Sequence, residues 1–373
     1  MKKVVENGID RIDTARNLLA ANRIGLLTNA SGLSKVMRPT VDILRERFTL
    51  SALYAPEHGI RGAKQAGGAD NDHMDPETGL PLFDLTGAGG AANPGALDNI
   101  DMLVYDIQDV GARFYTYIST LGDIMPKCGE RGIPVVVLDR VNPISGARVE
   151  GEILDKAYSS FVGRHAIPTR YGMTAGEYAR YINGEKNIGC ELHVVELAGW
   201  RRGMYLDDTD LSWVSPSPNI PTVDAAINYI GTCIFEATNI SEGRGTTHPF
   251  SLIGAPFLDS RRLAGEMNAQ RLGGVRFRRA SFIPMFSKHA GQLCEGVELL
   301  ITNRDEYRPF AAGAILLQTI REMAPEFKMD ARLSCMLFGS DRLCRGAIGA
   351  EDFAQMDKAA RSFAGKSAQY LLY

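Results

Sequence analysis

The sequence predicts an α/β protein in which a mostly parallel β-sheet, covered by helices on both faces, is followed by a smaller α+β module. Two observations support this prediction. In the first part of the chain, short apolar runs alternate with segments whose apolar residues have helical spacing. From about residue 259 the order changes to helix, strand, strand and long helix. We therefore expect two domains, comprising residues 1–258 and residues 259–373.

Four apolar runs in the first part of the chain are predicted to be strands, and they occupy residues 23–29, 50–55, 101–106 and 133–139. Each is apolar at nearly every position, as is typical of a strand buried on both faces of a parallel sheet. The intervening segments with helical spacing lie at residues 10–20, residues 40–48 and after residue 116.

Polar side chains follow each of these strands at the point where it ends. Right-handed crossovers place the carboxyl ends of parallel strands along one edge of the sheet, so these side chains are expected to share a rim. They are Asn29, Glu57, His58, Asp106, Asp109, Asp139, Arg140 and Asn142. Ligands of open α/β sheets bind at this edge, which makes the rim the first candidate for a functional site.

The middle of the chain continues the alternation. A helix is expected over residues 174–182, where Thr174 and Glu177 have the spacing of a capping box, and a strand over residues 191–197. A proline-rich loop at residues 215–221 is expected to be stiff and to form either a domain seam or a pocket wall. A helix over residues 223–238 then leads into a loop dense in reactive side chains, residues 239–250.

The last part of the chain is expected to form helix 261–272, strands 275–282 and 297–302, and the long helix 309–323. Six arginines between Arg261 and Arg279 lack the interleaved aromatic residues of a nucleic-acid-binding motif. We interpret them as a solvated face of the module.

Residues 62–95 are rich in Gly, Asp and Pro and show no periodicity, so a long loop over the sheet edge is expected. The glycine-rich stretch 87–92 resembles a dinucleotide fingerprint, but no strand precedes it and Asn93-Pro94 would break the helix that should follow. Residues 70–75 resemble a calcium loop without its spacing or its terminal bidentate Glu. Neither motif is expected to function.

Charge, cysteine spacing and the lengths of the apolar runs indicate which binding partners and which cellular compartment to expect. A net charge of −3 over 373 residues gives no general attraction to nucleic acid or to an anionic membrane. The six cysteines are widely spaced without a C-x-x-C pair, as expected for thiols of a reducing compartment. The N-terminal residues lack the apolar core of an export signal, and no apolar run has the length of a membrane span. We expect a cytoplasmic protein.

The densest group of chemically active residues follows the third predicted strand. Asp106 and Asp109 are followed by Arg113 and by Tyr115 and Tyr117. Carboxylates serve as general acids, bases or nucleophiles, arginine binds carboxylates through two hydrogen bonds, and tyrosine rings stack on sugars. Together with Glu57, these acids provide the pair of carboxyl groups that glycoside hydrolysis requires.

Other hydrolytic chemistries have less support. No G-x-S-x-G nucleophile elbow occurs, and the six histidines do not show H-E-x-x-H spacing. We expect no cofactor and no bound metal.

Five motifs, in order along nearly the whole chain, resemble those of the exo-β-N-acetylmuramidase family, long known as a domain of unknown function. They are Tyr54–Gly62 (YAPEHGIRG), Tyr105–Tyr117 (YDIQDVGARFYTY), Leu138–Pro143 (LDRVNP), Pro216–Pro221 (PSPNIP) and Asn239–Pro249 (NISEGRGTTHP). The resemblance implies a Rossmann-like domain with a smaller second domain. It also implies hydrolysis of terminal β-1,4-linked N-acetylmuramic acid (MurNAc) from the non-reducing end of peptidoglycan fragments.

Muramic acid carries a lactyl carboxylate, for which Arg61, Arg113 or Arg244 is a suitable partner. Its 2-acetamido group is an alternative nucleophile to a second protein carboxylate. With these arginines, the expected substrate-binding residues are Asn29, Tyr115, Tyr117, Asn219 and Glu242. The expected partner is a small glycan such as MurNAc–GlcNAc or a muropeptide, met during turnover of imported fragments.

The resulting hypothesis has Glu57 as general acid, His58 orienting it, and Asp106 or Asp109 supporting water or the anomeric charge. Glu150 and Glu242 are reserve carboxylates. One alternative is a sugar or muropeptide sensor without catalysis. Another is a metal-assisted hydrolase using Asp106, Asp109 and His58, whose activity a chelator would abolish.

Overall fold

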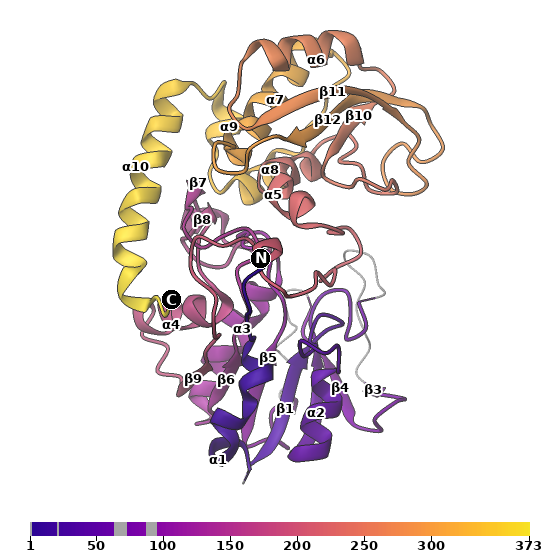
Figure 1. Ribbon diagram of the computed structural model, residues 1–373. Helices are drawn as coiled ribbons and strands as arrows, with labels where there is room; N and C mark the ends of the chain where they lie inside the picture. Colours follow the sequence, from indigo (N-terminus) through magenta and orange to yellow (C-terminus); the bar gives the residue numbers. More distant parts are fainter. Residues whose placement is uncertain (1, 21, 63–72, 87–94) are drawn as a thin grey trace. The chain divides into compact units, whose positions relative to one another are not determined.

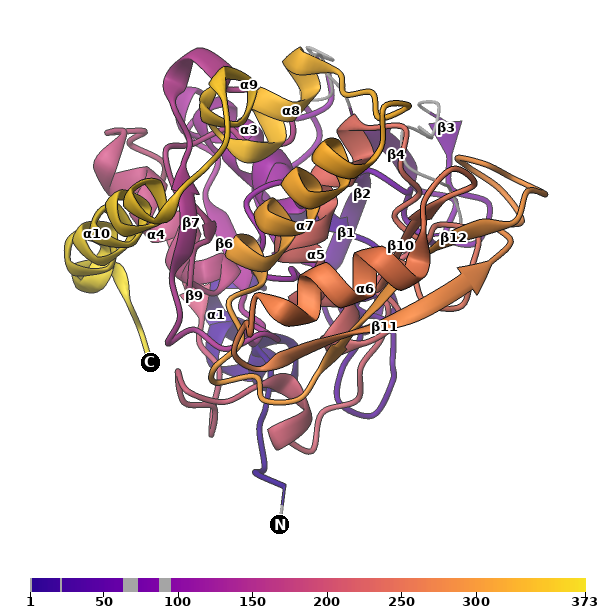
Figure 2. The same cartoon turned by 90° about the horizontal axis from the view of Figure 1, so that it is seen from above.

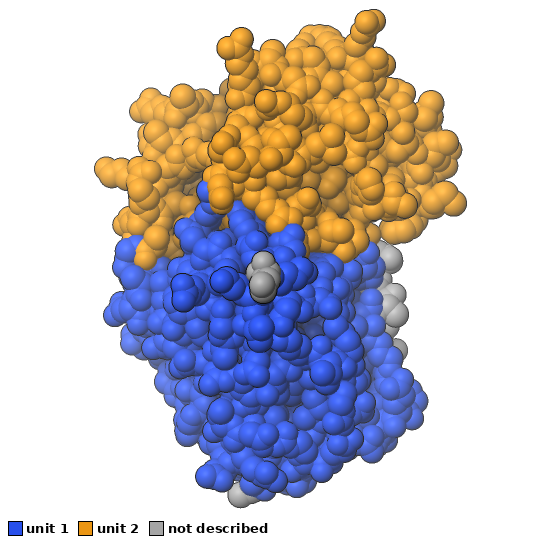
Figure 3. All heavy atoms as spheres, in the orientation of Figure 1, with its two compact units in different colours: residues 1–148, 172–218, 365–373 blue, residues 149–171, 219–364 orange. Residues whose placement is uncertain are grey.

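The computed structural model describes residues 2–20, 22–62, 73–86 and 95–373. The chain divides into two compact units, shown in different colours in Figure 3. Unit 1 contains residues 1–148, 172–218 and 365–373, and unit 2 contains residues 149–171 and 219–364. The domain boundary between residues 258 and 259 stays a prediction.

Unit 1 is built on a seven-stranded sheet in the order β3-β4-β2-β1-β5-β6-β9 (Figure 1). The strands are β1 (Arg23–Thr28), β2 (Thr49–Ala55), β3 (His73–Met74), β4 (Pro81–Asp84), β5 (Met102–Asp106), β6 (Val135–Leu138) and β9 (Leu192–Val195). All neighbouring strands pair in parallel except β3, which runs antiparallel to β4. The predicted α/β class and the strands predicted within this sheet are confirmed.

The helical segments of unit 1 follow the predicted alternation. They are the 3-10 helices η1 (Gly8–Ala15), η4 (Leu206–Asp208) and η6 (Ala368–Tyr370) and the α-helices α1 (Arg16–Leu19), α2 (Thr40–Arg47), α3 (Tyr117–Glu130) and α4 (Ala175–Glu185). The capping box of α4 is confirmed: the Glu177 amide donates to Thr174 Oγ1 over 3.2 Å, and the Thr174 amide donates to Glu177 Oε2 over 3.0 Å. Apolar side chains of η1, α1 and α2 pack with those of β1 and β2 in one buried cluster.

The segment predicted to be one long loop contains two strands in its described part. Leu82 of β4 lies opposite Leu53 of β2 in parallel register and is buried, and β3 pairs with β4, so the sheet extends two strands further than expected at this edge. The short run Leu80–Leu85 carries this signal, but the proline within it conceals a strand from a sequence reading. The glycine-rich stretch 87–92 lies outside the described residues, as do residues 70–72 of the calcium-loop-like motif.

Unit 2 combines a three-stranded antiparallel sheet, a hairpin and several helices (Figure 2). The sheet order is β10 (Leu252–Ala255), β12 (Cys294–Ile301), β11 (Val275–Phe282), and the hairpin is β7 (Glu150–Ile153) with β8 (Pro168–Arg170). The helical segments are η3 (Lys156–Tyr158), α5 (Val223–Thr232), η5 (Cys233–Ala237), α6 (Ser260–Ala269), α7 (Pro309–Met323), α8 (Ala331–Phe338) and α9 (Arg342–Arg345). Helix α10 (Ala350–Ser367) begins in unit 2 and ends in unit 1.

Two glycines allow helices α5 and α7 to meet backbone to backbone. A Cβ atom on Gly231 would lie 1.9 Å from the Pro309 carbonyl oxygen, and one on Gly313 would lie 2.1 Å from the Gly231 carbonyl oxygen. Contacts this short cannot be relieved by rotating a side chain, because the opposing atoms are backbone. The helix crossing therefore requires glycine at both positions.

In the part of the chain that the structure describes, no helix combines the length and the apolar character needed to cross a bilayer.

We expect Gly313→Ala to lower the free energy of unfolding by about 2–3 kcal/mol, because the added methyl group forces α5 and α7 apart. Gly265→Ala, within α6, is the matched control, since its Cβ would meet nothing within 4 Å. Helix propensity alone makes that control neutral or stabilising by up to about 1 kcal/mol. Urea denaturation of both variants measures the difference, and equal stabilities would contradict the close crossing.

Candidate active site

Glu57 lies in a tight turn directly after β2, at the carboxyl edge of the sheet. The Gly59 amide donates to the Pro56 carbonyl over 3.0 Å, which closes the turn. His58 has φ +74°, a left-handed conformation that is uncommon for residues other than glycine. His58 is buried as well, so the surrounding structure holds this conformation. The predicted switch from strand to proton-handling residues is thus a locally strained turn.

A hydrogen bond joins this turn to the motif that follows β5. The Thr116 hydroxyl donates to Glu57 Oε2 over 2.6 Å. Thr116 immediately precedes helix α3. The first two of the predicted motifs, far apart in sequence, therefore meet at the carboxylate of Glu57.

The second and the fourth motif meet at one backbone carbonyl, which Asn29 also contacts. The oxygen of Pro216 accepts hydrogen bonds from the Tyr117 hydroxyl over 2.6 Å and from Asn29 Nδ2 over 3.1 Å. The rings of Tyr115 and Tyr117 pack edge to face, with centroids 4.7 Å apart. The Pro216 carbonyl is therefore held by Asn29, which follows β1, and by Tyr117, the first residue of α3.

Nearby carboxylates affect the pKa values of Tyr115 and Tyr117. Burial is the main cause that raises the pKa of Tyr117 above its usual value, and the charges of Glu57 and Asp109 raise it further. Burial likewise raises the pKa of Tyr115, with a smaller contribution from Asp109. Asp109 thus acts electrostatically on both rings, and Glu57 acts on the ring of Tyr117.

Asp106 is engaged in a buried ion pair. Its Oδ1 accepts from Arg140 Nε over 2.5 Å, and its Oδ2 accepts from Arg140 Nη2 over 2.9 Å and from the Thr40 hydroxyl. The Asp106 side chain is 0% exposed. These contacts favour a structural role over the catalytic role expected from the sequence, because both oxygens are occupied.

Asp109 and Arg113 are both buried on the segment between β5 and α3. Asp109 Oδ2 accepts from the Gly111 amide over 2.6 Å, and Gly111 has φ +78°. Gln108 Nε2 donates to the carbonyls of Asp109 and Val141. The segment is therefore held in shape by its own side chains and by the residues that follow β6.

Arg61 forms ion pairs with two acidic residues that follow the turn in sequence. Its guanidinium pairs with Asp75 at 2.7 Å and with Glu77 at 2.8 Å. Hydrogen bonds to these carboxylates raise the pKa of Arg61. These contacts favour a role in holding the segment after β3 over direct binding of a substrate carboxylate.

The remaining predicted residues belong to unit 2. Glu242 is buried and accepts from Arg244 Nε at 3.1 Å and from Lys288 Nζ at 2.9 Å. Arg244 also donates to Glu236, whose pKa is raised chiefly by burial. This charge network stabilises the loop 239–249. Asn219 is buried too.

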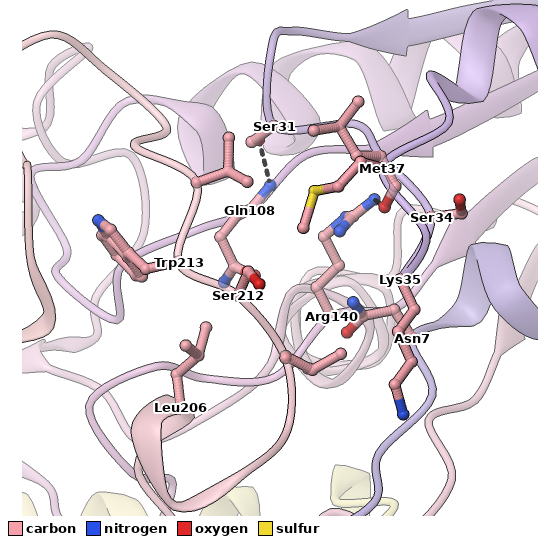
Figure 4. Close-up of a pocket in the computed structure, with 13 residues that line it drawn as sticks. Asn7, Ser31, Ser34, Lys35, Met37, Gln108, Arg140, Leu206, Ser212 and Trp213 are labelled. Atoms are coloured by element: carbon pink, nitrogen blue, oxygen red, sulfur yellow. Dashed lines mark hydrogen bonds between the residues drawn. The ribbon is translucent and has the colours of Figure 1, made fainter.

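Figure 4 shows a hollow at the carboxyl edge of the sheet of unit 1. Ser31, Gln108 and Arg140, which follow β1, β5 and β6, line it together with Trp213 and Ser212. The Gln108 amide donates to Ser31 Oγ over 2.9 Å, and Ser31 Oγ donates to Asn29 Oδ1 over 2.6 Å. The hollow thus adjoins the side chain that holds Pro216.

Sequence reasoning missed Ser31, Thr116, Gln108 and Trp213. Ser31 and Gln108 come two residues after Asn29 and Asp106, so the rule that selected strand ends would have found them with a wider window. Thr116 lies within the motif Tyr105–Tyr117, but nothing in the local sequence marks it as a functional residue. Trp213 precedes the proline-rich loop, and nothing in its local sequence marks it.

Among residues 2–20, 22–62, 73–86 and 95–373, no group of three or more His, Cys, Asp and Glu side chains is arranged to hold a metal ion.

The carboxyl edge of this open α/β sheet carries carboxylates, tyrosines and the strained turn that contains Glu57. Such an arrangement is typical of an enzyme active site. Comparison with known families makes this specific. The N-terminal model of the exo-β-N-acetylmuramidase NamZ matches residues 24–224, and the C-terminal model matches residues 227–373. The chain belongs to this family, and the resemblance identified from the five motifs is confirmed.

Relatives and solved structures agree with this membership. The chain is 47% identical over 328 residues to the peptidoglycan β-N-acetylmuramidase NamZ of Bacillus subtilis (strain 168), covering 87% of this chain and 79% of that protein. Crystal structures of two DUF1343 family proteins of Bacteroides fragilis NCTC 9343 each match over 99% of both chains. One has a TM-score of 0.91 at 34% identity. The other has a TM-score of 0.79 at 28% identity.

We expect Arg140→Met to lower the free energy of unfolding by about 3–5 kcal/mol, because it leaves the Asp106 carboxylate buried without its partner. The double variant Asp106→Asn/Arg140→Met should recover part of this loss, since no charge is then buried. Denaturant unfolding of the two single variants and the double variant gives the coupling energy. Additive losses would contradict a structural ion pair.

A second prediction concerns Asp139, which is buried after β6 and accepts hydrogen bonds from Thr174, Gly176 and Tyr373. Burial raises its pKa from 3.8 to about 7. The folded state therefore binds this proton more tightly than the unfolded state. The resulting stabilisation is fully present below pH 4 and is lost as the pH rises to 7.

The Asp139→Asn variant should lack this pH-dependent part, which amounts to at most about 4 kcal/mol. Urea midpoints of the wild type and the variant, measured from pH 4 to pH 8, test it. Parallel curves across that range would show that Asp139 does not titrate there.

Proposed function

We propose that this chain is an exo-acting β-N-acetylmuramidase that hydrolyses terminal β-1,4-linked MurNAc from the non-reducing end of peptidoglycan fragments. The observation that carries the proposal is the Glu57 carboxylate, held by Thr116 at the sheet edge where the family's motifs meet. Membership in the NamZ family and the similarity to a peptidoglycan β-N-acetylmuramidase support it.

In the proposed reaction, Glu57 gives its proton to the glycosidic oxygen as the bond to the anomeric carbon breaks. Either water or the oxygen of the substrate's 2-acetamido group forms the new bond to that carbon. In the second case a water molecule then attacks the same carbon, and the bond to the acetamido oxygen breaks. His58, in the same strained turn, orients Glu57. Hydrolysis ends when the proton of the attacking water passes to a carboxylate and the two sugars leave.

For the second carboxylate we favour Asp109 over Asp106. Both oxygens of Asp106 are occupied by Arg140 and Thr40 in the interior. The charge of Asp109 acts on Tyr115 and Tyr117, and the charge of Glu57 acts on Tyr117. We therefore propose that Asp109 works with Glu57 and supports the water molecule or the positive charge that develops at the anomeric carbon.

Substrate recognition is proposed to begin with Arg113 and the tyrosines of the same motif. In a buried setting an arginine pairs strongly with a carboxylate such as the lactyl group of MurNAc. Tyr115 offers a ring for the sugar, the fully buried Tyr117 packs edge to face against it, and Asn29 keeps the neighbouring Pro216 loop in place. For Asn219, Glu242 and Arg244, which belong to unit 2, a role in binding the substrate stays a prediction.

We also propose that the protein acts in the cytoplasm, on fragments recovered during cell-wall turnover. Its six cysteines are free thiols, and five of them are buried. Cys335 Sγ and Cys344 Sγ lie 3.3 Å apart and are joined by a thiol hydrogen bond, with both cysteines free. Such a pair suits a compartment that keeps thiols reduced.

Glu57→Gln should reduce the kcat for MurNAc–GlcNAc by about 10²–10⁴-fold, because the amide cannot protonate the leaving sugar. With a nitrophenyl muramide the loss should be much smaller, since nitrophenolate leaves with little protonation. Chromatography of released MurNAc and absorbance of nitrophenolate measure the two rates. Equal losses on both substrates would contradict the general-acid role.

The matched control is Glu46→Gln, which removes an exposed carboxylate of α2 paired with Arg38. This change should leave both rates within about twofold, because exposed ion pairs contribute little. Binding of MurNAc–GlcNAc by the wild type without release of sugar would favour the sensor instead. Loss of turnover with a chelator would favour the metal-assisted hydrolase.

A further inference from the structure

We infer that Thr116 is a positioning residue that fixes which oxygen of Glu57 delivers the proton. The inference rests on the proposed function, because it assigns a task to the hydrogen bond at the proposed general acid. Its basis is the 2.6 Å contact from the Thr116 hydroxyl to Glu57 Oε2.

The hydroxyl of Thr116 is not used to cap its own helix. Thr116 stands at the N-cap position of α3 but has helical backbone angles, and within the described chain its side chain makes no capping bond. Thr174 and Thr222, at the starts of α4 and α5, have extended backbones and accept hydrogen bonds from the following turn. The hydroxyl hydrogen of Thr116 goes instead to Glu57.

The donor is held by a rigid element. Thr116 is buried, and its carbonyl accepts from the Thr120 amide over 2.9 Å. Tyr117, Ile118 and Leu121 anchor the first turns of α3 in the interior. A threonine side chain has one stiff rotatable bond, so the position of its oxygen follows that of the helix.

The acceptor needs such a restraint. A glutamate side chain has three rotatable bonds and loses conformational freedom when it is ordered. The Gly59 to Pro56 hydrogen bond and the left-handed His58 order the backbone of the turn that carries Glu57. The Thr116 hydrogen bond fixes the end of the side chain, where the chemistry takes place.

The consequence is that the two oxygens of Glu57 are not equivalent. In the protonated carboxyl group one oxygen carries the hydrogen and the other only accepts hydrogen bonds. Because Thr116 donates to Oε2, that oxygen takes the accepting role, and Oε1 carries the proton passed to the leaving sugar. After transfer, Oε2 keeps its hydrogen bond, so the carboxylate does not have to reorient between turnovers.

The test is a comparison of Thr116→Val with Thr116→Ser on MurNAc–GlcNAc. Valine has nearly the same shape but no hydroxyl, so kcat should fall by about 10–100-fold while KM changes by less than about twofold, as expected when only orientation is lost. Serine restores the donor and should return kcat to within about threefold of the wild type. The matched control is Thr120→Val, which removes a hydroxyl that bonds only the backbone of α3, to the Thr116 carbonyl at 3.2 Å. It should leave kcat unchanged.

Thermal unfolding confirms that each variant is folded at the assay temperature. Thr116→Val turning over at the wild-type rate would overturn the inference alone. Equal loss of kcat in the valine and serine variants would overturn it too, because a donor would then not be the property that matters. A wild-type protein that releases no MurNAc would overturn the proposed function, and the inference with it.

Discussion

The buried ion pair between Arg140 and Asp106 is the interaction on which the site depends most. It joins the carboxyl ends of the neighbouring strands β5 and β6, and the Thr40 hydroxyl adds the start of α2 to the same carboxylate. The segment that follows Asp106 carries Asp109 and Thr116, so its course is set by this anchor. Replacing one partner of such a pair costs far more than the pair contributes, which makes the arrangement intolerant of change.

From that anchor the motif segments of unit 1 are joined by backbone and side-chain hydrogen bonds. The Pro216 carbonyl accepts hydrogen bonds from Asn29 and Tyr117. The hydrogen bond from Thr116 to the Glu57 carboxylate links the start of α3 to the turn after β2. Each of these junctions links segments separated by dozens of residues. The motifs of unit 1 lie far apart in sequence, and the sheet edge brings them together.

The sequence was informative where local physics decides. Apolar runs located the parallel strands, the limits of α7 were predicted residue for residue, and the capping box of α4 was visible as Thr174 and Glu177. The sequence did not predict features that depend on contacts between residues far apart in the chain. Nothing in the sequence separates Asp106, which is locked to Arg140, from Asp109, three residues away, because burial and partners arise only on folding. Strand β4 was missed because its strand character comes from pairing with β2.

The central claim is that this fold removes one sugar at a time from the non-reducing end of a peptidoglycan glycan. The most direct measurement is incubation of the wild-type protein with a defined oligosaccharide of alternating MurNAc and GlcNAc, with MurNAc at the non-reducing end, followed by product identification by mass spectrometry and proton NMR. Our account predicts free MurNAc and an oligosaccharide shorter by that one residue. Internal cleavage into smaller oligosaccharides, or binding without any cleavage, would contradict it.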